Sequence, residues 1–254
     1  MTRTSAPSFS VHIARTDSEL RAAKRLRYQV FIQELGGSGS LVDHDNMLEQ
    51  DRFDPYFDHL LLTDETRGQV VGVYRVMRCD QARAAGSFYS EDEYNIAPLL
   101  ASGRRLLELG RSCLHADYRG GAALFHLWSA LASYIAEHKI EVLFGVASFH
   151  GTDPMALAEP LSLLHHRHLA PEDLRAVAQP SCFQPMNLIA EKDLDPRAAM
   201  LQVPSLIKSY LRLGGFVGQG AFIDHSFNTT DVCLILDTTK MNQRQARIYQ
   251  GALS

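Results

Sequence analysis

The sequence predicts a mixed-sheet α/β or α+β domain, in which helices flank a central and mostly antiparallel sheet. Residues 59–63 and 69–77 are two apolar runs joined by a short polar turn, which is typical of an antiparallel hairpin. Residues 105–114, 121–138 and 141–149 then follow as a strand, a long helix and a strand. Antiparallel strands followed by a strand–helix–strand unit indicate this fold class.

Capping and turn signals place the other elements. Residues 9–13 alternate as a short strand, and the capping-box pair Thr16 and Glu19 starts a helix that runs to about Leu35. The glycine-rich residues 36–40 end this helix in a loop. The further expected elements are a short helical piece near 94–100, a helix at 154–167, a weakly extended stretch at 181–190, a helix at 204–213 with proline at its first position and Gly214 at its end, and strands at 216–223 and 231–237.

Composition bounds the class of protein. With 254 residues, of which 46% are hydrophobic and 21% charged, the chain can bury a substantial core and is expected to form one domain over 1–254. A net charge of −4 argues against bulk nucleic-acid binding. Four scattered cysteines indicate neither a disulfide framework nor a metal site. Because the N-terminus also has no apolar signal-peptide core, we expect a cytoplasmic protein, with a place on a membrane surface left open.

Charge is distributed unevenly along the first part of the chain. Residues 1–30 hold six Lys and Arg against two acids, whereas residues 31–70 hold nine Asp and Glu against two arginines. A basic helix and an acidic loop can serve an acidic partner and a cationic substrate, or be ordinary surface charge. Arg27 shares the apolar helix face of Phe31, and Arg75 lies in an apolar strand row. The alternative for Arg27 is the edge of the apolar stripe, with its head in water.

The stretch from Glu108 to Gly121 carries the strongest functional signal. Strand alternation places Glu108 and Arg111 on opposite faces, and a bulge at Gly110 would bring them to the same side. The N–H groups of Gly120 and Gly121, at the start of the following helix, can bind a phosphate. An ordinary strand–helix junction is the alternative interpretation.

Two further clusters suggest ligands. Asp51 and Asp54 are carboxylates three residues apart, which can hold an ammonium group or accept a proton from an amine. Ca²⁺ and plain solvated acids are the alternatives, although the EF-hand spacing is missing. His165, His166 and His168 resemble a metal site only in composition, because adjacent histidines in a helix face different ways. We therefore expect no metal.

Several separated segments resemble motifs of known acyltransferases. RYQVF at 27–31, DRFD at 51–54, VVGVYR at 70–75 and ELGR at 108–111 occur in the order seen in acyl-homoserine-lactone synthases, which are GNAT-like enzymes supplied by acyl carrier protein. YRGGA at 118–122 is similar to a degraded pyrophosphate loop of GNAT N-acyltransferases. After residue 150 the chain departs from the synthases. There, LIKSYLRLGG at 206–215 and DHSFNTTDV at 224–232 resemble the L-ornithine N(α)-acyltransferases of bacterial ornithine-lipid synthesis.

The resemblance implies a GNAT-like acyltransferase. Residues of about 8–150 would form the acyl-carrier and catalytic half, 151–240 a C-terminal half and 241–254 a tail. The implied reaction moves a 3-hydroxyacyl group from acyl carrier protein to the α-amine of L-ornithine, giving lyso-ornithine lipid. The phosphopantetheine thioester of acyl carrier protein is then the co-substrate, with no bound cofactor. A lipid product suggests contact with the inner face of the cytoplasmic membrane, and the oligomeric state stays open.

The resemblance also assigns roles to residues. Glu108 is the expected base or water-holder, Arg111 acts beside it, and Asp51 and Asp54 bind the ammonium groups of the substrate. Arg27, Arg75 and Arg111 position the loop carboxylates or the acyl carbonyl. The expected substrate-binding residues are Arg27, Phe31 and Arg75, with backbone N–H groups near Cys113 and Leu114 to polarise the thioester, and the expected phosphopantetheine-binding residues are Arg119, Gly120, Gly121 and Ala122.

An acidic carrier protein would dock on basic side chains. The expected docking residues are the Lys and Arg of the N-terminal helix together with Arg104, Arg105 and Arg119. Three rival functions remain: an acyl-homoserine-lactone synthase that uses S-adenosylmethionine, an acyltransferase for glycine, glutamine or lysine, and an inactive GNAT-like module that only binds the carrier protein.

Overall fold

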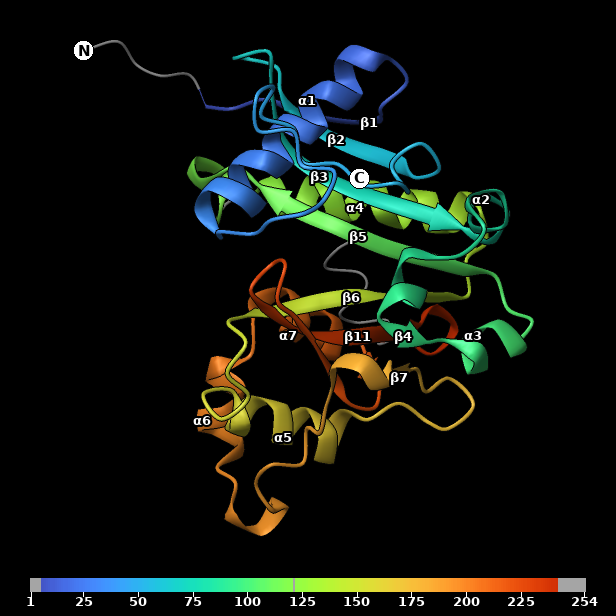
Figure 1. The fold of residues 1–254 in the computed structure, drawn as a ribbon. Helices are drawn as coiled ribbons and strands as arrows, with labels where there is room; N and C mark the ends of the chain where they lie inside the picture. The colour runs from blue at the N-terminus through green and yellow to red at the C-terminus, as the bar shows by residue number, and fades with distance from the viewer. Residues whose placement is uncertain (1–5, 121, 242–254) are drawn as a thin grey trace. The chain divides into compact units, whose positions relative to one another are not determined.

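The computed structural model describes residues 6–120 and 122–241, and its chain groups into two compact units (Figure 1). Among the described residues, the first unit contains 6–76, 110–120 and 122–138, and the second contains 77–109 and 139–241. The strand β5 (Leu106–Leu114) contributes its first half to the second unit and its second half to the first. Each unit is described by itself below.

The first unit is a sheet with a helix on each face. The strands β1 (Phe9–Ile13), β2 (Asp58–Asp64) and β3 (Gln69–Arg78) pair antiparallel in that order, and β3 is followed by β5. The helix α1 (Asp17–Arg27) covers one face and α4 (Ala123–Glu137) the other. On the α1 side, a core cluster joins helix and sheet: Ala23, Leu26, Val30, Leu61, Val73 and Cys113.

The N-terminal helix begins where the sequence predicted but becomes a π-helix before its expected end. The Thr16 hydroxyl oxygen accepts a hydrogen bond from the Glu19 backbone N–H, and the Glu19 carboxylate accepts one from the Thr16 backbone N–H, which completes the capping box. After Arg27 the chain continues as a π-helix over Tyr28–Glu34. Such wide turns are rare and occur often at functional sites.

The second unit contains a sheet in which most neighbouring strands run antiparallel. Its strands follow the order β5, β6 (Val142–His150), β11 (Thr229–Asp237), β10 (Ala221–Asp224) and β8 (Phe183–Gln184), and β9 (Phe216–Val217) also pairs with β11. β5 and β6 are parallel for only three residue pairs, which end at Glu108 and Phe144. β6 and β11 pair antiparallel along their whole length. The mostly antiparallel sheet expected from the sequence is confirmed.

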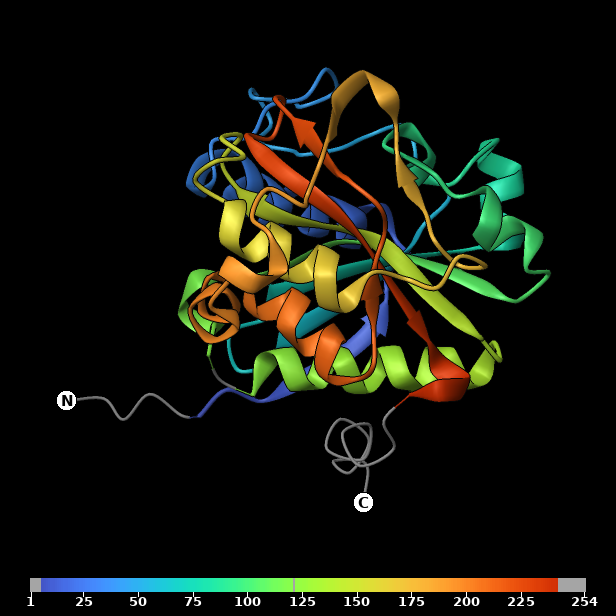
Figure 2. The same cartoon turned by 90° about the horizontal axis from the view of Figure 1, so that it is seen from below.

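Helices and short strands complete the second unit. The helices α5 (Ala158–His168), α6 (Pro196–Gln202) and α7 (Ser205–Arg212) gather on one side of its sheet (Figure 2). The helices α2 (Cys79–Ala85) and α3 (Ala97–Ala101) lie between β3 and β5 in the chain. A separate two-stranded sheet pairs β4 (Tyr94–Asn95) with β7 (Val177–Ala178).

Several sequence expectations were wrong in this unit. The sequence predicted a loop over 79–104 with one short helical piece near 94–100. This stretch also contains α2, and the expected helical piece begins as strand β4 before α3. The expected strand at 216–223 is broken into β9 and β10. Between them the Gln219 N–H donates to the Ala176 carbonyl at 2.8 Å, and Gly218 leaves room for this approach, since a Cβ there would lie 2.8 Å from the same oxygen. Pro204 is the N-cap of α7 and not its first residue, whereas Gly214 ends this helix in the left-handed conformation, as expected.

Candidate active site

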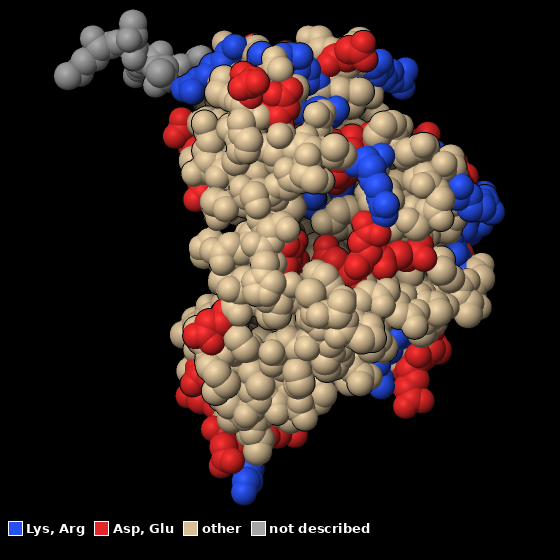
Figure 3. All heavy atoms as spheres, in the orientation of Figure 1, with Lys and Arg blue, Asp and Glu red and all other residues tan. Residues whose placement is uncertain are grey.

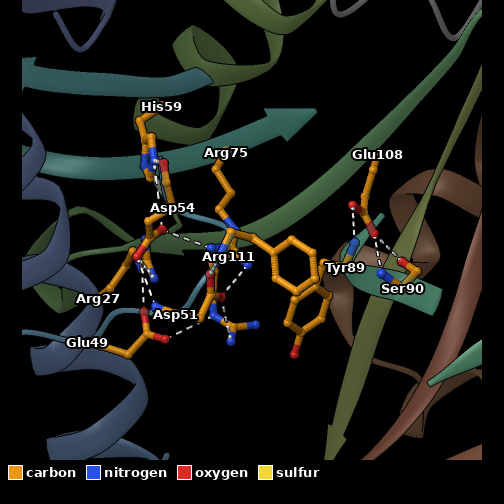
Figure 4. A network of polar contacts seen from close by, with 11 residues as sticks. Arg27, Glu49, Asp51, Asp54, His59, Arg75, Tyr89, Ser90, Glu108 and Arg111 are labelled. Carbon is orange, nitrogen blue, oxygen red and sulfur yellow. Dashed lines mark hydrogen bonds and ion pairs between the residues drawn. The ribbon is translucent and has the colours of Figure 1, made fainter. Parts of the chain in front are cut away.

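Three arginines and three carboxylates of the first unit form a closed ring of ion pairs (Figure 4). Arg27 comes from the end of α1, Arg75 from the middle of β3 and Arg111 from β5. The acids come from the loop between the π-helix Tyr28–Glu34 and β2. In order around the ring, the residues are Arg27, Asp54, Arg75, Asp51, Arg111 and Glu49.

The contacts within the ring are short. Arg27 donates to both Asp54 oxygens, at 2.6 and 3.3 Å, and to Glu49. Arg75 donates to Asp54 at 2.9 Å and to Asp51 at 2.6 Å. Arg111 completes the ring with Glu49 at 3.2 Å and Asp51 at 3.5 Å. Each carboxylate lies between two guanidinium groups, and the three positive and three negative charges balance.

The ring has a buried side and a more open side. Arg27, Arg75 and Glu49 are at most 1% exposed, whereas the side chains of Asp51 and Arg111 are 17% and 13% exposed. Arg111 has a φ of +49°, a left-handed conformation that costs a residue with a side chain free energy. Its two ion pairs direct its guanidinium into the ring. The more exposed edge of the ring is therefore formed by Asp51 and Arg111.

Electrostatics keeps all three acids ionised. Burial alone would raise the pKa of Asp54, but the charges of Arg27 and Arg75 outweigh it and hold this pKa well below its usual value. The pKa values of Glu49 and Asp51 are lowered in the same way, with burial opposed by the arginine charges. The sequence analysis expected Asp51 and Asp54 to bind ammonium groups. In the structure their oxygens already accept hydrogen bonds from arginines, which favours the positioning of these carboxylates by Arg27, Arg75 and Arg111.

His59 is buried beside Asp54 of the ring, and we expect it to make the stability of the protein depend on pH. Its Nε2 is 3.1 Å from the Asp54 carbonyl oxygen, and burial followed by the charge of Arg27 lowers its pKa to about 4. An unfolded histidine has a pKa of about 6.5, so the unfolded state binds the proton first as the pH falls. We expect the free energy of unfolding to decrease from pH 6.5 to pH 4 by on the order of 3 kcal/mol. Chemical denaturation across this range measures it, and His59→Gln should remove most of the slope.

Glu108 belongs to the second unit and has its own set of donors. It is 1% exposed and accepts hydrogen bonds from the backbone N–H of Tyr89 at 2.9 Å and of Ser90 at 2.5 Å, and from the Ser90 hydroxyl (Figure 4). These donors stand at the start of the short 3-10 helix Tyr89–Asp92. Three donors on one buried carboxylate suit its ionised form. They also fix its orientation, which a positioned base or water-holder requires.

The sequence predicted a bulge in β5 at Gly110 and a thioester site near Cys113. The irregular residue of β5 is Arg111, one position later than expected. Cys113 is buried against Leu26 and Val30, and burial raises the pKa of its thiol to about 12, so it is no nucleophile near neutral pH. Phe31 lies beside the ion-pair ring. The Arg111 guanidinium is 6.0 Å from the centre of the Phe31 phenyl group.

The expected phosphate-binding segment is described in part. Gly121 lies outside the described residues. Arg119 donates from Nε to the Leu114 carbonyl at 3.0 Å and forms a 2.5 Å ion pair with Glu34. Gly120 has a φ of +77°, and Ala122 stands at the N-cap of α4, where its side chain makes no capping hydrogen bond. The first-turn N–H groups of α4 are therefore not capped by that residue.

Other predicted features have structural explanations. His166 lies on α5 with Nε2 2.9 Å from the Ile189 carbonyl oxygen, and burial lowers the pKa values of His165 and His168. Within the described residues no helix is both long and apolar enough to cross a membrane. Sequence reasoning missed Glu49, His59 and Ser90 as site residues. Glu49 was noted only as one of many loop acids, and His59 and Ser90 carry no local signal.

Comparison with known proteins identifies the family. A model of the acetyltransferase (GNAT) domain matches residues 26–129. An L-ornithine N(alpha)-acyltransferase from Rhodobacter capsulatus is 57% identical over 247 residues, which cover 95% of this chain and 95% of the relative. Two solved structures share the fold. A CoA-dependent acyl-homoserine lactone synthase with MTA has a TM-score of 0.54 at 15% identity, over 97% of this chain and 90% of its own.

The second solved structure is an N-acyl amino acid synthase from uncultured soil microbes, with a TM-score of 0.51 at 12% identity over 93% of each chain. Both likenesses confirm the GNAT-like fold that the motifs implied. The relative from Rhodobacter capsulatus extends over almost the whole of both chains, including the C-terminal segments that depart from the lactone synthases. The chain belongs to the L-ornithine N(α)-acyltransferase family.

Proposed function

We propose that this protein transfers a 3-hydroxyacyl group from the phosphopantetheine thioester of acyl carrier protein to the α-amine of L-ornithine, giving lyso-ornithine lipid. The observation that carries the proposal is the 57% identity, over 95% of both chains, to a protein named for N(α)-acylation of L-ornithine. In the reaction the amine nitrogen bonds to the acyl carbon, the carbon–sulfur bond breaks, and the amine loses a proton while the carrier leaves as a thiol.

The amine must be neutral before it can attack. A free α-amine has a pKa of about 8, so a carboxylate that accepts its proton, directly or through water, makes the nucleophile available. We assign this role to Glu108, because the Tyr89 and Ser90 donors hold its carboxylate in one orientation. The backbone N–H groups near Cys113 and Leu114 are assigned to the thioester oxygen.

The ion-pair ring is proposed as a rigid frame. Arg27, Arg75 and the acids between them hold Arg111 and Asp51 at its accessible edge. There Arg111, with Phe31 beside it, would contact the acyl carbonyl or the substrate carboxylate. The ring remains charged in this role because each pKa is held away from the neutral range.

The carrier's phosphate is assigned to the start of α4. Arg119, Gly120, Gly121 and Ala122 would bind it through backbone N–H groups and the helix dipole. One solved structure with this fold is that of a CoA-dependent acyl-homoserine lactone synthase, and CoA carries the same pantetheine arm. An acyl-CoA donor is therefore the natural comparison in any assay of the donor.

Docking of the acidic carrier protein is assigned to the basic side chains of α1 with Arg119, which all belong to the first unit. Arg105 belongs to the second unit, where its Nε donates to the Lys139 carbonyl. Arg104 is less suited than the sequence suggested, because it donates to Asp237 and to the Glu141 carbonyl. Positive and negative side chains are interspersed over α1 (Figure 3). The docking surface is thus mixed in sign, and single charges should affect the encounter more than the chemistry. Contact with the inner face of the cytoplasmic membrane is proposed from the lipid product alone.

Arg25→Glu tests this docking surface. Arg25 is exposed on α1, and reversing its charge should raise KM for acyl carrier protein about 3- to 10-fold, with little change in kcat and with less effect at high salt. Steady-state kinetics at two ionic strengths measures this. Arg83→Glu, at an exposed position of α2, makes the same change in net charge elsewhere. Equal effects of both variants would place docking elsewhere.

A substrate panel tests the function against its rivals. Purified protein is incubated with 3-hydroxyacyl carrier protein or the matching acyl-CoA, and with L-ornithine, L-lysine, L-glutamine, glycine or S-adenosylmethionine. We expect acyl-ornithine from the carrier-protein donor. A homoserine lactone from S-adenosylmethionine would identify a signal synthase, and another acyl amino acid would identify a different acceptor. Tight carrier binding without any product would identify an inactive binding module.

A further inference from the structure

A cluster of acids in the second unit takes no part in the chemistry described so far. Glu93, Asp224 and Asp231 each direct a carboxylate oxygen to a common point, with these oxygens within 4.8 Å of one another. Glu93 and Asp231 are 5% and 3% exposed. Like charges this close in a buried place repel one another, and a cation held among them relieves the repulsion.

A buried hydroxyl is placed on the same sheet face as the cluster. In the antiparallel pair of β10 and β11, Asp224 stands directly opposite Thr229, and Asp231 follows two residues later on the same face of β11. Thr229 is 9% exposed, and its Oγ1 has no hydrogen-bond partner among the described residues. A buried hydroxyl without a partner costs free energy, so a ligand that donates or accepts a hydrogen bond here is favoured.

The cluster lies on the face that carries Glu108. In the strand registers, Glu108 pairs with Phe144, and Phe144 pairs with Ile235. Ile235 and Asp231 are four residues apart in β11 and so project to the same side. Cys233, between them, has a raised pKa, caused first by burial and then by the negative charges of Glu108 and Glu93. The proposed base and the acidic cluster therefore lie on the same face of the second unit's sheet.

We propose that Glu93, Asp224, Asp231 and the Thr229 hydroxyl bind the side-chain ammonium group of the acceptor amino acid. This assignment rests on the proposed function, in which the acceptor is a diamino acid. Its side-chain amine resembles that of lysine, with a pKa of about 10.4, and is a cation at neutral pH. Three carboxylates hold such a cation and raise its pKa further.

The same contacts account for acylation at the α-nitrogen. A protonated amine has no lone pair with which to attack a thioester. The cluster thus keeps the side-chain nitrogen inert, while the α-amine, with a pKa of about 8, loses its proton more readily. Selection of a diamino acid and choice of its nitrogen would follow from one group of side chains.

L-Norvaline, which has a methyl group in place of the aminomethyl end of ornithine, isolates this contact. We expect the wild-type protein to prefer L-ornithine to L-norvaline in kcat/KM by at least about 100-fold. Asp224→Asn and Glu93→Gln should each reduce this ratio about 10- to 100-fold. Asp224 is partly exposed, so its variant is the safer one for folding. Asp173→Asn, at an exposed position of the same unit, is the matched control and should keep the ratio.

Three further results decide the matter. An unchanged ratio in both folded variants, with ornithine still acylated, overturns the assignment and leaves the proposed function intact. Loss of wild-type activity on chelation, restored by Ca²⁺ or Mg²⁺, assigns the cluster to a metal and also overturns it. If the wild-type protein acylates no amino acid at all, the proposed function falls and this assignment falls with it. Isothermal titration calorimetry tests the assignment without turnover. Tighter binding of ornithine than of norvaline by the wild type, with this preference reduced in Asp224→Asn, supports it.

Discussion

Asp54→Asn should destabilise the protein by about 3–5 kcal/mol. The carboxylate of Asp54 accepts hydrogen bonds from Arg27 and Arg75, and both arginine side chains are fully buried. An amide in its place brings no negative charge and presents an N–H group to two guanidinium groups. The two buried guanidinium groups then lose a shared counter-charge. Removing one partner of a buried ion pair destabilises a protein strongly because it leaves the other charge buried and uncompensated.

Denaturant unfolding of Asp54→Asn measures this loss directly. Asp45→Asn is the matched control, because Asp45 is exposed in the same loop and should change the free energy of unfolding by at most about 0.5 kcal/mol. Similar stabilities of the two variants would show that the ring contributes little to folding. The loss in Asp54→Asn should be smaller at a pH near 2. The unfolded Asp54 carboxylate binds a proton below about pH 4, whereas the native carboxylate has a lowered pKa, so the wild type loses this stabilisation as the pH falls.

Glu108→Gln should lower kcat by about 100- to 10,000-fold, as expected for loss of general-base assistance. The amide cannot accept a proton from the amine, and its NH₂ group would oppose the N–H donors of Tyr89 and Ser90. The wild-type rate should rise with pH as the amine loses its proton, and the variant should retain this dependence at a lower level. Rates with saturating donor and acceptor across pH 6–10 give both quantities.

Ser90→Ala separates catalysis from structure at this position. It removes one donor to the Glu108 carboxylate and leaves the carboxylate itself in place. We expect a kcat between those of the wild type and Glu108→Gln, with KM for both substrates nearly unchanged. Thermal unfolding confirms that the variants are folded. If Glu108→Gln is folded and keeps the wild-type rate across this pH range, Glu108 has no part in proton transfer.

Local patterns predicted the elements of the fold where the signal is local. The hairpin of β2 and β3, the capping box at Thr16 and the helix end at Gly214 each depend on neighbours in sequence, and all are present. α2 and α6 were missed although both have sequence signals, namely Gly86 at the end of α2 and the N-cap Asp195 of α6. The break between β9 and β10 depends on a backbone approach to Ala176, which no local pattern reveals.

The site could be predicted only in part, for a similar reason. Arg27 and Arg75 stood out as charged residues on apolar faces, and the structure confirms that both are buried. Their shared partner Asp54 belonged to an expected acidic pair, but its partners are arginines 27 and 21 residues away in sequence. Glu49 closes the ring through Arg111, which is 62 residues away. Periodicity shows which side chains are unusual, whereas the pairing between distant segments requires the fold.

The central claim is N(α)-acylation of ornithine from acyl carrier protein, and tandem mass spectrometry of the product tests it most directly. Purified protein, 3-hydroxyacyl carrier protein and L-ornithine should give one amide per carrier thiol released, with the acyl group on the α-nitrogen and a free side-chain amine. The same reaction without the protein should give none. A product acylated on the side-chain nitrogen, or no amide while the folded protein and intact thioester are both present, would contradict the account.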